Sequence, residues 1–455
     1  MKSRRIWMEF YKTNAEMIAD LEGTLTVEPF EVKDRDQFRT SIDKLVHTAV
    51  FGDEAKEGAR WIIRMGANAC GAVSASIQGL YDAIGRGEAG GFTVPAHNLR
   101  GMIYDKARAI FRSAIALDCG AFIFEIARSE MGYCEVRPGE YSACVLGAAI
   151  KEGWEGPVFI QGDHFQFAAK EYFQNPEKVT QEIKDLTQEA IEAGFYNIDI
   201  DSSTLVVLDR PTVKEQQRDN YERCAELTRF IREIEPVEVS VGGEIGEVGK
   251  KNSTVEEFEA FYEGFQEHWD GKPISKMSVQ TGTAHGGVIA EDGTRARVKL
   301  DFKVLKEISV ACRKHGLGGA VQHGASTLPE SSFTEFPANE AVEIHLATQF
   351  QRMVFDHEKF PYKGDLVEWV KREQPKEWKA EQTEAQNIEK SIKRTWAPFK
   401  EQVWGMSSDT KAEIVSDLEE KFRTLMGLLN AKGTRSVVDR FVTPTVVTPP
   451  KPEGF

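Results

Sequence analysis

Short apolar, β-branched runs alternate with amphipathic stretches from about residue 91 to residue 348. Runs of this kind are typical of strands that are buried on both faces, as in a parallel sheet covered by helices. The pattern therefore predicts a repeated strand–helix unit. The runs are found at 91–98, 120–127, 156–164, 197–203, 237–246, 276–285, 318–326 and 341–348.

The stretches between these runs have the spacing of helices with one apolar face, most clearly 103–117, 178–193 and 301–314. Strands that alternate with helices imply a parallel sheet. Eight such units in about 250 residues have the size of a TIM barrel. An open doubly wound sheet is the alternative, but its first strand is usually followed by a glycine-rich phosphate turn, and the turn here, HNLRGM, is not one. We therefore predict an α/β fold, a (β/α)8 TIM barrel with helical extensions at both ends.

Both ends of the chain lack this alternation. Helical spacing without strands is found at 35–48 and 53–65, and again in charged segments at 364–374, 379–403 and 408–431. The last residues, TPTVVTPPKPEGF, are too rich in proline for a regular helix. The predicted organisation is an N-terminal helical extension (1–75), the barrel (76–358), a C-terminal helical extension (359–440) and an extended tail (441–455).

Composition limits the class of protein. The chain has 455 residues, 41% of them hydrophobic, which is ample for a large core. The net charge of −15 argues against nucleic acid and anionic membranes as main partners, although a small anionic substrate responds to local charge instead. Six scattered cysteines without a CxxC pair fit a reduced compartment. No signal peptide or membrane-length apolar run is present, so we expect a soluble, cytoplasmic protein.

Polar residues that bind metals or move protons stand at the ends of the predicted strands. In a TIM barrel these positions share the rim where the active site is built. Four of the nine histidines fall there, whereas chance would spread them over helices and loops. One histidine at a strand end is usually structural, but several at aligned ends favour a metal site. The strand-end residues are Asn98, Asp163, His164, Asp201, Glu244, His285, His323 and His345.

Three imidazoles from different strands predict an open zinc site with room for substrate. Co²⁺ and Mn²⁺ suit nitrogen and oxygen ligands as well. Asp201 and Glu244 are either further ligands or residues that orient the histidines, and the sequence favours neither option. Bound at a ketone, the metal would acidify the adjacent C–H, and Asp163 would act as general acid or base.

Together these segments resemble the class II, zinc-dependent fructose-bisphosphate and tagatose-bisphosphate aldolases. The resemblance covers roughly 76–356, and it lies in the order and spacing of the motifs. The segments are LYDAIGRGEAGGFTVPAHNLRG (80–101), QGDHF, DIDSS (199–203), GGEIG (242–246), GTAHGG (282–287), VKLDFKVLKEI (298–308) and VQHGAS (321–326).

The resemblance implies a role for each matching residue. Asp163 would transfer the proton, His164, His285 and His323 would bind zinc, and Asp201 and Glu244 would lie beside the metal. A monovalent cation and a dimeric or tetrameric homo-oligomer are further implications. The residues implied to bind substrate or its phosphate are Asn98, Gly286, Gly324, Ser326 and Thr348.

Departures from the family pattern fall on the substrate site. The final strand reads HLATQ where the family has NIATD, so His345 and Gln349 replace the asparagine and aspartate that bind substrate in the family. The family's phosphate-binding lysine after the HG motif is missing, and the candidate substitutes are Arg295, Arg297 and Lys299. The loop after GGEIG is short, with Glu247 as the candidate that takes the carbon-bound proton.

We therefore predict a metal-dependent aldolase that reversibly cleaves a ketose phosphate into a dihydroxyacetone-phosphate-like fragment and an aldehyde, with a substrate other than fructose 1,6-bisphosphate. One alternative is a non-catalytic partner subunit of a class II aldolase. The other is a metal-dependent sugar isomerase or epimerase on the same barrel.

Overall fold

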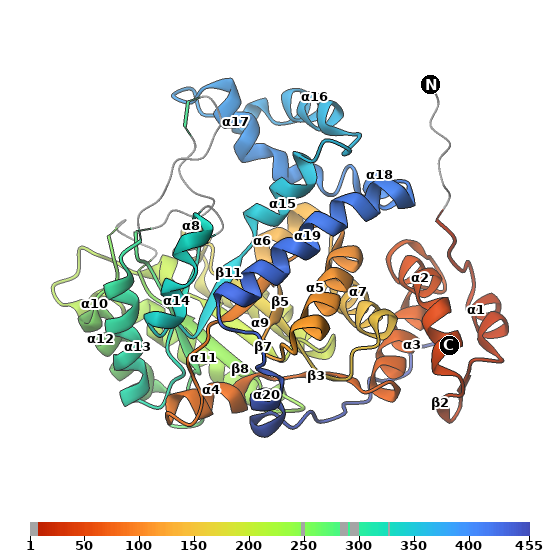
Figure 1. Cartoon of the computed structure of the whole chain (residues 1–455). Coiled ribbons are helices and arrows are strands. Elements are labelled where there is room, and N and C mark those ends of the chain that lie inside the picture. Colours follow the sequence, from red (N-terminus) through yellow and green to blue (C-terminus); the bar gives the residue numbers. More distant parts are fainter. Residues whose placement is uncertain (1–7, 247–250, 283–289, 292–299, 326–327) are drawn as a thin grey trace.

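The eight runs of the repeating pattern form a closed parallel barrel. A computed structural model of the chain describes residues 8–246, 251–282, 290–291, 300–325 and 328–455. The barrel strands pair in chain order, and the last pairs with the first (Figure 1), so the predicted (β/α)8 barrel is confirmed. These strands are β4 (Val94–Asn98), β5 (Ile123–Ala127), β6 (Gly156–Gln166), β7 (Asn197–Asp201), β8 (Ser240–Glu244), β9 (Lys276–Val279), β10 (Ala320–Gln322) and β11 (Glu343–Leu346).

A further strand and a short helix precede the barrel. Strand β3 (Ala72–Ala75) pairs in parallel with the first residues of β6, and β7 pairs with β6 further along. Helix α4 (Gln78–Gly85) follows and buries Tyr81 against the apolar residues at the beginning of the barrel strands. The sequence did not predict β3, because a four-residue run is too short to show a period.

The helices of the repeat surround the barrel, as their one-sided apolar stripes require. Helix α5 (Ile103–Leu117) has the predicted bounds and buries Ala107, Ile110 and Phe111. Helix α12 (Val255–His268) is capped by Thr254, which forms a reciprocal capping box with Glu257. The other elements of this part are α6 (Arg128–Cys134), α7 (Pro138–Glu152), α8 (Ala169–Tyr172), α9 (Pro176–Glu192), η1 (Ser203–Leu205), α10 (Val213–Gln216), α11 (Arg218–Ile234), α13 (Phe302–Lys314), η3 (Glu330–Ser332), α14 (Glu335–Ala338) and α15 (Thr348–Phe355).

The segment before the barrel lies on its outer side, where α2 and α3 pack against α7. The two segments with helical spacing correspond to these helices, whereas the hairpin β1–β2 was not predicted, because three-residue strands carry no detectable alternation. The elements are α1 (Asn14–Leu21), β1 (Leu25–Val27), β2 (Phe30–Val32), α2 (Arg35–Phe51) and α3 (Lys56–Ala69).

The segment after the barrel is a series of helices, of which α19 packs along α5. The stretch 379–403 has helical spacing but is broken into shorter pieces, and Pro398, which has no N–H and a fixed φ, lies in one break. Among the described helices of the chain, none is both long and apolar enough to cross a membrane. The elements are α16 (Lys363–Glu373), η4 (Pro375–Glu377), α17 (Glu384–Ser391), η5 (Ile392–Thr395), α18 (Lys400–Trp404), α19 (Ser408–Leu428) and α20 (Arg435–Phe441).

The last residues, 442–455, form neither helix nor strand and run back to the N-terminal segment (Figure 1). The indole N–H of Trp61 donates to the carbonyl of Pro449 at 3.2 Å, and Lys451 pairs with Glu28 at 2.6 Å. The proline-rich tail is thus an extended arm that is held on the N-terminal helices.

Candidate metal and active site

A bulge at the end of β6 brings two adjacent polar residues to the same side of the strand. Gly162 pairs with Ile198 but Phe165 pairs with Ile200, so β6 has one residue more than β7 between these pairs. His164 takes the left-handed conformation, with φ of 42°. Adjacent strand residues normally face opposite sides, and a bulge of this type changes their direction. A non-glycine residue in this region costs on the order of 1–3 kcal/mol and is typical of functional sites.

The imidazole of His164 lies among three carboxylates. Its Nδ1 is 2.9 Å from Asp201 Oδ2 and 3.1 Å from Glu244 Oε2, and its Nε2 is 3.8 Å from Asp163 Oδ1. Burial lowers the pKa of His164, but the charges of Asp163 and Glu244 outweigh it and raise the pKa well above its ordinary value. Three carboxylates around one imidazole favour a positive charge at this place.

Asp201 is held from both of its oxygens. Gln166 donates to Oδ2 at 2.5 Å, and the hydroxyl of Ser203 donates to Oδ1 at 2.7 Å. Burial raises the pKa of Asp201, but hydrogen bonds from His164 and Ser203 outweigh burial and lower it. Neither Gln166 nor Ser203 was predicted, although both lie within two residues of a predicted site residue.

His323, at the end of β10, brings a second imidazole to the cluster. Its ring centroid lies 4.3 Å from that of His164, and its Nε2 lies 2.9 Å from Ser278 Oγ. Ligand atoms of Asp163, His164 and His323 lie within 4.8 Å of one another, as do those of His164, Asp201 and Glu244. Two imidazoles with adjacent carboxylates are the donors that Zn²⁺ and similar divalent ions take, so the residues present fit such a metal.

Beneath this cluster the barrel interior is filled by a layer of charged and amide side chains. The ammonium of Lys276 donates to Glu343 at 2.6 Å, to Gln161 at 2.7 Å and to Asp199 at 3.0 Å. Gly242 leaves the room for this layer, because a Cβ there would lie 2.3 Å from Asp199 Oδ1. The members of this layer, which we call the buried layer, are Glu125, Gln161, Asp199, Lys276 and Glu343.

The buried layer was not predicted, but the sequence contains a signal for it. Gln161, Asp199 and Glu343 each stand two positions before a predicted site residue, and side chains two apart share one face of a strand. Alternation within the runs thus placed these side chains directly below the strand-end residues. Their partners across the barrel depend on strand register, which the sequence alone does not reveal.

Comparison with models of protein families shows which family the chain belongs to. The family model described as fructose-bisphosphate aldolase class-II matches residues 80–401, well over half of the chain. The chain belongs to the class-II fructose-bisphosphate aldolase family. The resemblance predicted from the motifs is therefore confirmed, whereas the search of curated proteins finds no significant match.

Solved structures are similar to this class-II aldolase family member at low sequence identity. Fructuronate-tagaturonate epimerase UxaE from Cohnella laeviribosi has a TM-score of 0.51 and 12% identity, over 74% of this chain and 81% of that one. Fructose-bisphosphate aldolase Fba from Campylobacter jejuni has a TM-score of 0.44 and 17% identity, over 80% and 98%. The YdjI aldolase from Escherichia coli K12 has a TM-score of 0.42 and 14% identity, over 74% and 99%.

Three further residues were expected to bind substrate, and the structure places each of them in a different environment. Asn98 donates to Glu130 at 2.6 Å, and Glu130 also pairs with Arg100 at 2.6 Å, so Asn98 is tied to the first turn of α6. Thr348 is buried at the first position of α15. Gly324, directly after His323, has a φ of 71°, which a non-glycine residue rarely takes.

The remaining predicted site residues lie outside the described part of the chain. They are Glu247, His285, Gly286, Arg295, Arg297, Lys299 and Ser326. Their roles in the family site stay predictions from the sequence.

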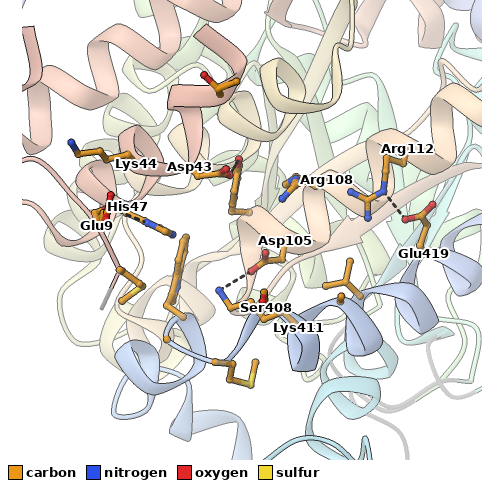
Figure 2. Close-up of a pocket in the computed structure, with 18 of the residues that line it drawn as sticks. Glu9, Asp43, Lys44, His47, Asp105, Arg108, Arg112, Ser408, Lys411 and Glu419 are labelled. Carbon is orange, nitrogen blue, oxygen red and sulfur yellow. Dashed lines mark hydrogen bonds and ion pairs between the residues drawn. The ribbon is translucent and has the colours of Figure 1, made fainter. Parts of the chain in front are cut away.

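A separate crevice of about 1410 Å³ lies outside the barrel, between the N-terminal helices, α5 and α19. Figure 2 shows that its walls carry charges of both signs, with Arg112 directed at Glu419 and Lys411 at Asp105. Of the residues predicted for the aldolase site, none that the structure describes lines this crevice. We call it the outer crevice.

Proposed function

We propose that this protein catalyses reversible retro-aldol cleavage of a ketose phosphate into a dihydroxyacetone-phosphate-like fragment and an aldehyde, with a divalent metal. The observation that supports it most is the β6 bulge, which sets Asp163 and His164 side by side next to His323, Asp201 and Glu244. A proton-transfer group beside a metal site is what cleavage of a carbon–carbon bond next to a ketone requires.

His164 and His323 would hold the metal together with His285, and Asp201 and Glu244 would orient or complete the set. Zinc is the metal that the family implies, and Co²⁺ or Mn²⁺ also suit these donors. When bound, it would polarise the substrate ketone and stabilise the negative charge that develops during cleavage.

The chain's own residues would move the protons and hold the substrate. In cleavage, Asp163 would accept the proton of the C4 hydroxyl, and in condensation it would return that proton to the aldehyde oxygen. Glu247 is proposed to handle the carbon-bound proton. The phosphate would be held by Ser326 and by backbone N–H groups near Gly286 and Gly324, with Arg295 or Arg297 adding charge. A monovalent cation, a homo-oligomer and a cytoplasmic location remain part of the proposal.

The first test is metal content of the purified full chain with and without chelator, together with product analysis on a panel of ketose mono- and bisphosphates. We expect about one zinc per chain and cleavage that chelator abolishes. His323→Ala should lose metal and activity. Asp163→Asn should keep the metal and lose about 10²- to 10⁴-fold in kcat. His268→Ala, at the outer end of α12, is the matched histidine control and should change neither.

Product analysis on a wider panel separates the aldolase from an epimerase and from a non-catalytic subunit. An epimerase would return a single ketose of inverted configuration with no aldehyde, and UxaE, which shares the fold, is named for that reaction. The panel therefore includes ketose uronates. A chain that binds no metal and cleaves nothing would contradict the proposal and favour a non-catalytic partner subunit.

A further inference from the structure

His345 lies on β11 between the metal cluster and the buried layer. Its side chain is almost entirely buried. Its Nδ1 is 3.2 Å from Asp163 Oδ1 and 3.0 Å from Glu125 Oε2, and its Nε2 is 2.6 Å from Glu343 Oε1. Both ring nitrogens thus face carboxylates of the protein, which leaves neither of them for the substrate contact expected from the family asparagine.

Glu343 anchors this ring from below. Lys276 donates to Glu343 Oε1 at 2.6 Å and Gln161 donates to the same oxygen at 2.9 Å, while the hydroxyl of Tyr81 donates to the other oxygen. Glu343 and Lys276 are buried from solvent. A carboxylate with this many donors has one orientation, so it fixes the position of Nε2 and with it the plane of the His345 ring.

Asp163 lies at the other nitrogen. The terminal torsion of an aspartate is soft, so the plane of its carboxylate depends on the groups that it contacts. The hydrogen bond between Nδ1 and Oδ1 restricts the plane of the carboxylate and therefore the direction of both of its oxygens. Proton transfer depends steeply on that direction, because a displacement of about 1 Å costs about 10²-fold in rate.

We propose that His345 is a positioning residue, which orients the Asp163 carboxylate through Nδ1 and is itself held by Glu343 through Nε2. This inference rests on the proposed role of Asp163 in proton transfer. In this inference His345, which replaces the family asparagine, contacts the protein's own acid–base group Asp163. It does not contact the substrate.

A pair of charge-matched variants tests it. In His345→Asn the amide nitrogen takes the place of Nδ1 and still reaches toward Asp163. In His345→Gln the amide nitrogen takes the place of Nε2 and reaches toward Glu343 only. Both variants lose the same ring and any charge it carries, so a difference between them reports which nitrogen matters.

We expect His345→Gln to lose about 10- to 100-fold in kcat, as for other residues that orient a catalytic group. KM and metal content should stay close to the wild-type values, and His345→Asn should keep most of kcat. An increase in KM at constant kcat would instead indicate a substrate contact. Equal losses in the two variants would indicate a structural role, and either result would overturn the inference.

Crystal structures of the wild type and both variants give a second readout that needs no turnover. The Asp163 carboxylate should keep its plane in His345→Asn and rotate in His345→Gln. If the wild type cleaves none of the ketoses, the proposed function fails, yet these structures still decide whether His345 orients Asp163. An unchanged Asp163 in His345→Gln would refute the positioning role whatever the activity.

Discussion

The buried layer of the barrel and the outer crevice contain the same kinds of side chain in opposite surroundings. In the layer, Lys276 and Glu343 pair at 2.6 Å with side chains at most 1% exposed. In the crevice, Arg112 and Glu419 pair at 2.7 Å, but their side chains are 32% and 15% exposed. Water stabilises each crevice charge by itself, whereas a charge in the layer depends on its protein partners. Equal distances therefore do not mean equal contributions to stability.

The largest expected effect comes from removing the one ammonium of the layer. Lys276→Met leaves Asp199 and Glu343 buried without their cation, and breaking a buried pair in this way costs about 3–5 kcal/mol. The free energy of unfolding in urea measures it. Lys184→Met is the control, because Lys184 pairs with Glu226 at 2.6 Å on the outer helices. A loss in Lys276→Met no larger than in the control would contradict the dependence of the layer on this cation.

This layer also marks the limit of what the sequence predicted. All eight barrel strands and the bounds of α5 follow from the sequence, because apolar runs that recur between amphipathic stretches identify even short strands. The strand-end residues Asp163, His164 and His323 follow from the same pattern, since parallel strands present their ends at one rim.

What the sequence did not predict depends on contacts between distant residues. The β6 bulge that turns His164 toward Asp201 is set by register, and no local motif announces it. The place of His345 is a similar case. Its position on the final strand was predicted, but its carboxylate partners Asp163, Glu125 and Glu343 lie on other strands or two residues away. The resemblance to the family suggested a substrate contact there, because a family pattern describes the residue it replaces and not its new neighbours.

A buried group that stays neutral should show an intermediate effect, and His97 on β4 is such a group. Its ring is fully buried between Phe350 and Phe422, and its Nδ1 lies 3.3 Å from the carbonyl of Ile123. Burial lowers the pKa of His97 from 6.5 to about 4. The unfolded chain therefore binds an extra proton between these values. The stability that His97 provides is complete above pH 6.5 and is lost as the pH falls toward 4.

Over that window the loss should approach roughly 3 kcal/mol, from a shift of this size at about 1.4 kcal/mol per unit. The measurement is urea unfolding of the wild type and His97→Leu at pH 7 and at pH 4.5. The leucine variant removes this proton uptake, so the two stabilities should converge as the pH falls. Parallel pH profiles would show that His97 is already charged, or solvated, in the folded protein.

The smallest effect is expected in the outer crevice, and it completes the comparison. A double-mutant cycle on Arg112→Ala and Glu419→Gln isolates the energy of this pair, shown in Figure 2, from the other effects of each change. We expect a coupling of about 0.2–1 kcal/mol that decreases in high salt, as for other partly exposed pairs. Arg112 also pairs with Glu152 at 3.0 Å, so it is not left without a partner when Glu419 is changed.

A coupling above about 2 kcal/mol would place the crevice pair in the same regime as the buried layer. Ion pairs in the crevice and in the buried layer would then contribute similar energies, and burial would not explain any difference in stability between the two regions. A small, salt-sensitive coupling beside a large loss in Lys276→Met would instead show that burial, at nearly the same pair distance, decides what an ion pair contributes. It would also explain why charges of both signs can line the crevice without specific pairing. Inside the barrel, by contrast, the carboxylates of the buried layer beneath Asp163 need specific partners.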